Sequence, residues 1–350
     1  MEPLDPNIPE SNNELGESTN LGAEGHTESV FENRIDIDDL GRGIERIRKE
    51  IAKVVIGQSQ MIDLLIICLL TEGHALIEGV PGVAKTLTAK LMARTVATNF
   101  SRIQFTPDLM PSDVLGTSVF NFQSSEFDFK KGPIFSNMVL IDEINRAPAK
   151  TQAALFEVME ERQITIDGLQ FKMEPPFMVL ATQNPIEQEG TYRLPEAQLD
   201  RFLFKINVGY PSVEEEAQII QAFHDSGNRN LLEEVQAVVT PEELRTFKEK
   251  VRAIRIEKDL IRYIAEGVQM TRENKSLYLG ASPRASLALM ISSKAYAAMQ
   301  GRDFVTPEDI KFVAKPVLRH RVILSPELEM EGVSADKVID TLLSRVEIPR

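Results

Sequence analysis

The feature that most constrains this chain is a glycine-bounded loop at residues 79–86, which reads Gly-Val-Pro-Gly-Val-Ala-Lys-Thr. It follows the apolar run Ala75–Ile77 and precedes a helical pattern from Lys85 to about Thr98. Such a loop between a strand and a helix is the setting of a P-loop. Its backbone N–H groups and the positive end of the helix can hold phosphate oxygens. We therefore predict a nucleotide-phosphate site, although a structural Gly-Pro turn is the simpler alternative.

In a P-loop, Lys85 would reach the β- and γ-phosphates and the Thr86 hydroxyl would hold Mg²⁺. The sequence departs from the usual pattern at Ala84, where a glycine normally precedes the lysine. A methyl group is tolerated at that position if the residue has ordinary helical dihedral angles. The residues predicted to bind nucleotide in this segment are Gly79, Val80, Pro81, Gly82, Val83, Ala84, Lys85, Thr86 and Leu87.

Two carboxylates follow a second apolar run 57 residues after Lys85. Residues 138–141 predict a buried strand, and Asp142 and Glu143 come at its carboxyl end, where α/β sheets bind ligands. Asp142 suits the Mg²⁺ shell, through water. Glu143 suits the general base that deprotonates the attacking water. Without the P-loop, a solvated Asp-Glu pair would be the better interpretation.

A third predicted strand, Phe177–Ala181, ends in Thr182-Gln183-Asn184-Pro185. The amide of Asn184, at a strand end beside the carboxylates, could hydrogen-bond the γ-phosphate or the attacking water. An Asn-Pro turn is the structural alternative.

The alternation of strands and helices predicts an α/β fold with a mostly parallel sheet between helices. After Pro211 the strand pattern ends and six helical stretches follow, so we expect a second, all-helical domain. Residues 1–33 are polar and acidic and are expected to be disordered. The predicted organisation is a tail at 1–33, an α/β nucleotide-binding domain at 34–210 and a helical lid domain at 211–350.

Charge and composition exclude several functions. The net charge is −14, and the first 40 residues hold 11 acidic residues against one basic residue. The rest is nearly balanced, which disfavours nucleic acid as the main ligand. The longest apolar stretch is too short for a membrane span, and the single cysteine allows no internal disulfide. We expect a soluble, cytoplasmic protein without a membrane span.

Together these motifs resemble the AAA+ ATPases, and more narrowly the MoxR family, over about residues 34–346. The resemblance rests on GVPGVAKT (79–86), LIDEINRAPAKTQAALFEVMEER (140–162), ATQNP (181–185), EGTYRLPEAQLDRF (189–202) and GASPRASLAL (280–289). It implies an AAA+ core with a helical lid, an insert in helix 2 within residues 107–132, and a hairpin at 163–173 before the sensor-1 strand.

The resemblance also assigns roles. It implies that Asn184 is the sensor-1 residue, Arg201 the arginine finger and Arg284 the sensor-2 arginine. Gly57 and Gln58 match the family's Gly-Gln element, with Val55 and Ile56 near the adenine. From the residues alone, Arg201 could simply pair with Glu196 or Asp200. Arg284 at a helix start opposes the helix dipole, which makes sense if phosphate lies nearby.

The implied function is Mg²⁺-dependent ATP hydrolysis coupled to remodelling or maturation of partner proteins. The resemblance implies a hexameric ring and partners with von Willebrand factor A domains. A metal-chelatase motor subunit is an alternative, and a nucleic-acid motor is a weaker one. The sequence leaves open the client, the form of the ring, the subunit on which Arg284 acts and the role of the acidic tail.

Overall fold

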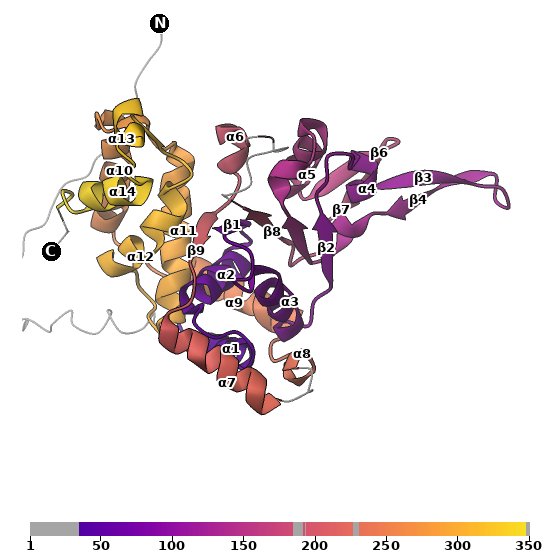
Figure 1. The fold of residues 1–350 in the computed structure, drawn as a ribbon, viewed down its shortest axis with the longest axis horizontal. Helices are drawn as coiled ribbons and strands as arrows, with labels where there is room; N and C mark the ends of the chain where they lie inside the picture. Colours follow the sequence, from indigo (N-terminus) through magenta and orange to yellow (C-terminus); the bar gives the residue numbers. More distant parts are fainter. Residues whose placement is uncertain (1–34, 185–191, 193, 227–230, 348–350) are drawn as a thin grey trace, which may run out of the picture. The chain divides into compact units, whose positions relative to one another are not determined.

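A five-stranded parallel sheet forms the centre of the molecule (Figure 1). The computed structural model describes residues 35–184, 192, 194–226 and 231–347, so the predicted disordered tail at 1–33 lies outside the described residues. The strands run in the order β2-β5-β8-β1-β9. Their bounds are β1 Ala75–Gly79, β2 Phe100–Gln104, β5 Met138–Asp142, β8 Met178–Gln183 and β9 Phe204–Val208.

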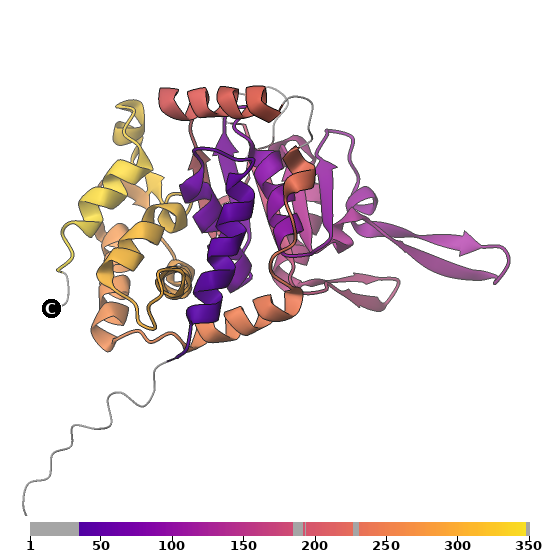
Figure 2. The ribbon, with the colours of Figure 1, turned by 90° about the horizontal axis from the view of Figure 1, so that it is seen from below.

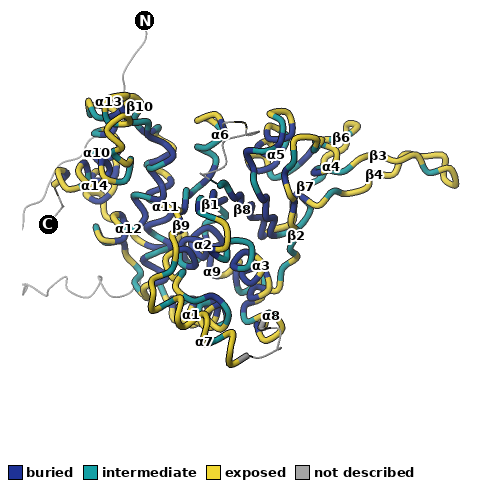
Figure 3. The backbone as a smooth tube through the Cα atoms, viewed as in Figure 1, coloured by how far each residue is buried: buried dark blue, intermediate teal, exposed yellow. Residues whose placement is uncertain are grey.

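The central strands are buried on both faces, as the apolar runs predict for a parallel sheet. Along β5, Met138 and Leu140 belong to one hydrophobic cluster, whereas Val139 and Ile141 belong to another. This division follows from the two-residue period of a strand, which sends successive side chains to opposite faces. Figure 3 shows the sheet and the helix surfaces against it as a continuous buried region.

Helices cover both faces of this sheet, which confirms the predicted α/β class (Figures 1 and 2). Helices α1, α2 and α3 contribute to one hydrophobic cluster, and α5 contributes to the other. The helices up to residue 200 are α1 Asp38–Ala52, α2 Ser59–Thr71, α3 Lys85–Thr95, α4 Pro111–Leu115, α5 Ala149–Glu161 and α6 Glu196–Leu199, with 3₁₀ turns at Pro133–Phe135 and Ile144–Arg146.

Two antiparallel hairpins leave the sheet. One pairs β3 (Gly116–Asn121) with β4 (Glu126–Lys131), and the other pairs β6 (Gln163–Ile166) with β7 (Leu169–Lys172). The β3–β4 hairpin projects away from the sheet in both ribbon views (Figures 1 and 2). Most of its residues are exposed (Figure 3), so its own cross-strand pairs hold it together.

The chain beyond β9 is helical except for one short two-stranded sheet. Its helices are α7 Val213–Ser226, α8 Leu231–Glu234, α9 Pro241–Ala253, α10 Lys258–Glu273, α11 Pro283–Met299, α12 Pro307–Leu318, α13 Pro326–Met330 and α14 Ala335–Leu343, and its strands are β10 Leu277–Leu279 and β11 Ile323–Leu324. One hydrophobic cluster runs from α1 and α2 into α10, α11 and α12. The predicted boundary near residue 210 therefore stays a prediction. Among the described helices, none is long and apolar enough to cross a membrane.

Candidate functional site

The loop between β1 and α3 has the backbone of a phosphate-binding turn. Gly82 lies at φ +87°, and Ala84 is the N-cap of α3 at φ +59° and ψ +20°. The expectation that Ala84 has ordinary helical angles is therefore wrong. A left-handed alanine is strained because its Cβ crowds the following carbonyl oxygen. Ala84 still belongs to the turn, because the helical dihedral angles of α3 begin only at Lys85.

Lys85 lies at the start of α3 and is partly buried, as are Ala84, Thr86 and Leu87. Its ammonium donates to the carbonyl oxygen of Gly79, at the other end of the loop. Burial lowers the pKa of Lys85 from its ordinary value, while the nearby carboxylates of Asp142, Glu143 and Glu78 act in the opposite direction. Lys85 comes after the carboxyl end of β1 and the two carboxylates come at the carboxyl end of β5, with β8 between these strands, so all three lie at one edge of the sheet.

Asp142 ends β5 and is only 7% exposed. The Arg102 side chain donates to its Oδ2 at 2.6 Å, and the Thr182 hydroxyl donates to its Oδ1 at 3.0 Å. Both partners come from neighbouring strands, because β2 and β8 flank β5 in the sheet. The carboxylate is thus fixed by one cation and one hydroxyl at the carboxyl edge of the sheet.

Glu143 follows directly and adopts a left-handed backbone at φ +58°. Its N–H donates to Thr182 Oγ1 at 3.1 Å. Its carboxylate accepts a hydrogen bond from Gln104 at 3.0 Å and forms an ion pair with Arg146 at 2.9 Å. Strain in a non-glycine residue that its surroundings hold in place is typical of functional sites.

The residues predicted to bind metal are Thr86 and Asp142. A hydroxyl and a carboxylate are oxygen donors, which Mg²⁺ prefers, and this ion usually keeps water and phosphate in the rest of its shell. The structure has no group of three or more His, Cys, Asp and Glu side chains suited to a metal within its described residues. The donor set fits an ion that arrives with nucleotide rather than one held by protein alone.

The other predicted residues lie at two places. Asn184 comes directly after β8, one residue beyond Gln183, and is partly buried. Val55 is 5% exposed and packs in the core, whereas Gly57 and Gln58 line a cleft of about 520 Å³. Ile56 is partly buried between them.

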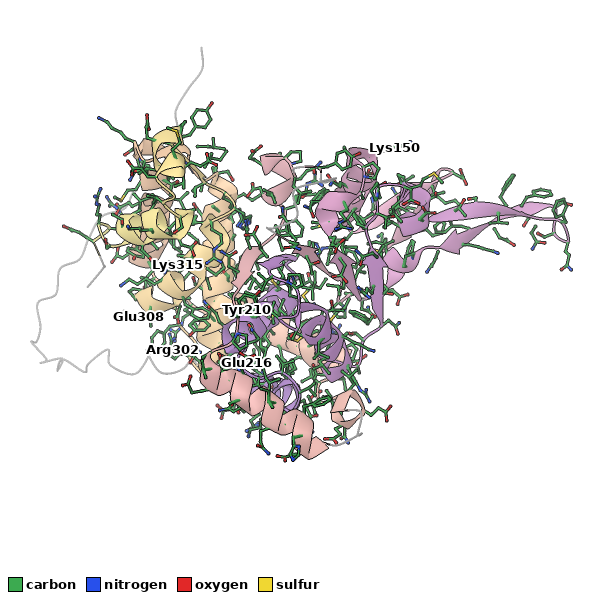
Figure 4. All side chains as sticks on the ribbon, in the orientation of Figure 1. Lys150, Tyr210, Glu216, Arg302, Glu308 and Lys315 are labelled. Carbon is green, nitrogen blue, oxygen red and sulfur yellow. The ribbon has the colours of Figure 1, made fainter. Side chains whose placement is uncertain are left out.

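This cleft lies between the α/β part and the lid. Gly209 and Tyr210 follow β9, whose Val208 pairs with Gly79, so the cleft is next to the start of the P-loop. The lid contributes Arg319 and Lys315, of which Figure 4 labels Lys315. The full lining is Gly57, Gln58, Ser59, Gln60, Met61, Leu64, Ile206, Asn207, Gly209, Tyr210, Lys315, Pro316, Arg319 and Asp336.

The two predicted arginines meet at one carboxylate of α5. Arg284 donates to both oxygens of Glu160, at 2.7 and 2.8 Å, and Arg201 Nε lies 3.8 Å from Glu160 Oε2. Arg201 also donates to the Phe156 carbonyl. The hydrogen bond from Arg284 is the main reason that the pKa of Glu160 is lowered. Neither arginine contacts the P-loop among the described residues.

Of the two local partners that the sequence left open for Arg201, Glu196 and Asp200, the structure does not pair it with Asp200. Asp200 instead accepts from Arg321 at 2.6 Å. The dipole cost predicted for Arg284 at the start of α11 is offset by Glu160.

Sequence reasoning missed several polar partners of the site: Arg102, Gln104, Thr182 and Glu160. A signal for two of them was present. Arg102 and Gln104 alternate with apolar residues on β2, and Gln104 pairs in register with Asp142. Arg146, three residues after Glu143 in the sequence, contacts its carboxylate. Nothing in the sequence marks Glu160 as a partner of the two arginines, because α5 lies beside them only in the folded chain.

Two family models match the sequence. The model described as "ATPase family associated with various cellular activities (AAA)" matches residues 74–204, and the model described as "AAA lid domain" matches residues 269–342.

Several known proteins are similar over most of their length. "Uncharacterized protein YeaC" of Bacillus subtilis is 44% identical, over 89% of this chain and 95% of its own. "Chaperone MoxR1" of Mycobacterium tuberculosis is 44% identical, over 88% of this chain and 82% of its own. "Protein MoxR" of Methylorubrum extorquens is 31% identical, over 81% and 89%. A crystal structure of a protein described as an ATPase from Cytophaga hutchinsonii has a TM-score of 0.82 and 44% identity, covering 89% of this chain and 97% of that one.

Proposed function

Because the chain belongs to the MoxR family of AAA+ ATPases, we propose that it hydrolyses Mg-ATP and couples the hydrolysis to remodelling or maturation of partner proteins. The observation that carries the proposal is the convergence of Lys85, Asp142 and Glu143 at the carboxyl edge of one parallel sheet. Ligands of such sheets bind at this edge.

The P-loop binds the phosphates. Its N–H groups and the positive end of α3 attract phosphate oxygens. Lys85, which bridges to the Gly79 carbonyl in this structure, is close enough to the loop to exchange that partner for a phosphate oxygen. Thr86 and Asp142 would hold Mg²⁺, which neutralises charge on the β- and γ-phosphates. Arg102 on Asp142 adds a positive group at the same edge.

Glu143 acts as the general base. Gln104 and Arg146 hold its carboxylate, and Thr182 holds its backbone, so its position is set before substrate arrives. A preset base lowers the cost of aligning the attacking water. Asn184, at the end of the neighbouring strand, orients that water or the γ-phosphate. The cleft lined by Gly57 and Gln58 takes the base and ribose.

Arg201 and Arg284 act on the nucleotide of a neighbouring subunit in a homo-oligomer, which we propose is a hexameric ring. Their shared contact with Glu160, away from the P-loop of their own chain, supports this assignment for both. An arginine finger supplies positive charge to the transferring phosphoryl group. In the free chain the Glu160 carboxylate takes the place of the phosphoryl group as the negatively charged partner of both arginines.

Partner proteins are expected to meet the β3–β4 hairpin. Phe122 and Phe127 are 88% and 71% exposed, and both rings lie near Phe120 in a projecting hairpin. Exposed aromatic clusters of this kind are typical of interaction sites. Partners with von Willebrand factor A domains rest on the family resemblance, and affinity capture with Glu143→Gln tests them. The cytoplasmic location that we propose rests on the composition of the chain.

Two substitutions test the ATPase. Lys85→Ala should lose most ATP affinity, because the phosphates lose their principal side-chain cation. Glu143→Gln should bind ATP normally but stop turnover, because an amide cannot accept the proton of water. Lys90→Ala, an exposed lysine on α3, is the matched control for Lys85. Wild-type ATP affinity in Lys85→Ala, or wild-type turnover in Glu143→Gln, would contradict the proposal.

Mixed oligomers test the two arginines. Arg201→Ala should bind ATP normally and hydrolyse it more slowly, by up to about 10³-fold. Mixing it with Glu143→Gln creates interfaces with an intact base and an intact neighbouring arginine, so activity should return. Subunit exchange is first shown by fluorescence transfer between labelled chains. Wild-type turnover of Arg201→Ala alone would end the finger assignment.

A further inference from the structure

The carboxylate of Asp200 links two lid elements to the chain segment that carries Arg201. Its Oδ1 accepts from Arg321 Nε at 2.6 Å, and its Oδ2 accepts from the Ser282 hydroxyl at 3.2 Å. Asp200 directly precedes Arg201, and Ser282 comes two residues before Arg284. The same carboxylate thus ties together the backbone positions from which both arginines extend.

The Arg321 side chain is 3% exposed and is held on every side. Besides Asp200 Oδ1, its guanidinium donates to the carbonyl oxygens of Asp200, Phe202 and Leu203 and to Val317 of α12. These contacts engage all five N–H donors that a guanidinium has. His320 Nε2 lies 3.0 Å from the same Phe202 carbonyl. The turn that follows α12 therefore fixes the backbone on both sides of Arg201.

Ser282 contacts Asp200 rather than the first turn of its own helix. It is the N-cap residue of α11, where a serine side chain usually accepts a hydrogen bond from an N–H of the first turn. In the structure its hydroxyl makes no such bond to α11 and instead donates to Asp200.

We propose that Asp200 is a positioning residue that holds Arg201 and Arg284 as one unit directed at the neighbouring subunit's nucleotide. Arg321, three residues after α12, anchors this unit to that helix through the Val317 carbonyl, and Lys315 of α12 lines the cleft of the same subunit. The proposal rests on the proposed function, in which both arginines act on the neighbour's nucleotide. A change of α12 on nucleotide binding is then transmitted to the arginines through Arg321 and Asp200.

The first test separates positioning from simple support of the lid. Asp200→Asn keeps the shape of the side chain but replaces one acceptor oxygen with a donor. We expect kcat to fall by roughly 10- to 100-fold, because small displacements of catalytic groups have effects of this size. ATP affinity should stay within about twofold of wild type. Asp303→Asn is the matched control, because Asp303 accepts from Arg255 at 3.3 Å elsewhere in the lid, outside α12. It should lower Tm and leave kcat per folded subunit unchanged.

Ser282→Ala keeps the test valid if Asp200→Asn does not fold. It removes only the hydroxyl that contacts Asp200, so Tm should hardly change while kcat falls several-fold. The proposal is wrong if Ser282→Ala and any folded Asp200→Asn both turn over ATP at the wild-type rate. The proposal is also wrong if the decrease in kcat is proportional to the decrease in Tm across all three variants.

Two further measurements identify the residue through which Asp200 acts. Added to an Arg201→Ala/Arg284→Ala chain, Asp200→Asn should cause no further loss of kcat, because the groups that it positions are already gone. Mixed with Glu143→Gln, Asp200→Asn should regain activity as Arg201→Ala does. A further loss in the first case, or no recovery where Arg201→Ala recovers, overturns the proposal. Full turnover by Arg201→Ala would instead overturn the proposed function of the finger.

Discussion

Two residues of the candidate site have a left-handed backbone although neither is glycine. Ala84 begins α3 at φ +59°, and Glu143 follows β5 at φ +58°. In each case the position is held by the elements around it, the P-loop turn for Ala84 and the contacts to Thr182 and Gln104 for Glu143. Backbone strain of this kind is typical of functional sites, where the strained geometry contributes to the mechanism.

The strain at Ala84 leads to a stability prediction. Ala84→Gly should raise the free energy of unfolding by up to about 1 kcal/mol, because glycine adopts positive φ without steric cost. Lys90→Gly, on the exposed side of the same helix, should instead lower it by about 1 kcal/mol. Denaturant unfolding of both variants checks this. Equal destabilisation by the two glycines would mean that the alanine is not strained.

His74, just before β1, predicts a dependence of stability on pH. Burial lowers the pKa of His74 to about 4, from an ordinary 6.5. Its Nδ1 accepts from the Val179 N–H and its Nε2 lies 3.1 Å from the Met159 carbonyl, which the neutral ring satisfies. As pH falls from 6.5 to 4, the unfolded chain binds a proton that the folded chain does not.

The free energy of unfolding should therefore fall by about 1.4 kcal/mol per pH unit in that window from this group, and by about 3 kcal/mol in all. Above pH 6.5 the contribution is fully present. His74→Gln should flatten the dependence measured by urea unfolding between pH 6.5 and 5, whereas His224→Gln, at an exposed position of α7, should not. An unchanged slope in His74→Gln would exclude this source.

At the scale of elements, the β3–β4 hairpin divides its aromatic residues by role. Phe129 packs 4.4 Å from Phe171 and 5.9 Å from Phe135 between ring centres, near the base of the hairpin. Phe122, Phe127 and Phe120 form a separate group toward its turn, and each is exposed. The first group attaches the hairpin to the rest of the molecule, and the second is the surface that we propose for a partner protein.

Substitution should separate these roles. Phe122→Ser should leave Tm unchanged within about one degree, because the ring is already in water, while weakening binding of a permanently unfolded protein such as reduced, carboxymethylated lactalbumin. Phe129→Ser should lower Tm, since it removes buried aromatic contacts. Circular dichroism melting and fluorescence anisotropy measure the two effects. A Phe122→Ser chain that binds the probe as tightly as wild type would exclude the aromatic group as a contact.

At the scale of the whole molecule, Glu160 connects the free chain to the proposed oligomer. It holds Arg284 and Arg201 in the isolated subunit, so a neighbour's ATP must replace it as their partner. Removing this competition should favour assembly. Glu160→Gln is therefore expected to form ATP-dependent oligomers at lower protein concentration than wild type.

Sedimentation velocity over a concentration series with ATP checks this expectation. Glu161→Gln, at the exposed next position of α5, removes the same charge without the contact and serves as the control. Identical assembly curves for the two variants would show that Glu160 does not compete with nucleotide for the arginines.

The sequence by itself determined the α/β class, the strands of the central sheet and the family. Each depends on local information: apolar runs of strand length, a glycine-bounded loop between a strand and a helix, and carboxylates directly after a buried strand. The strand predicted at Phe177–Ala181 begins one residue before β8 and ends two residues before its end, because β8 is Met178–Gln183. The left-handed angle of Ala84 was missed because an alanine in sequence carries no mark of positive φ.

Only the tertiary structure decided the partners of the charged side chains. Arg102 meets Asp142 across 40 residues, Arg284 meets Glu160 across 124, and Arg321 meets Asp200 across 121. A charged side chain in sequence has many possible partners, and burial and strand order choose among them. Asp200 beside Arg201 suggested a local pair. Instead, Asp200 pairs with Arg321, in the turn after α12, and Arg201 contacts Phe156 and Glu160 of α5. Packing of the lid on the sheet brings those elements together.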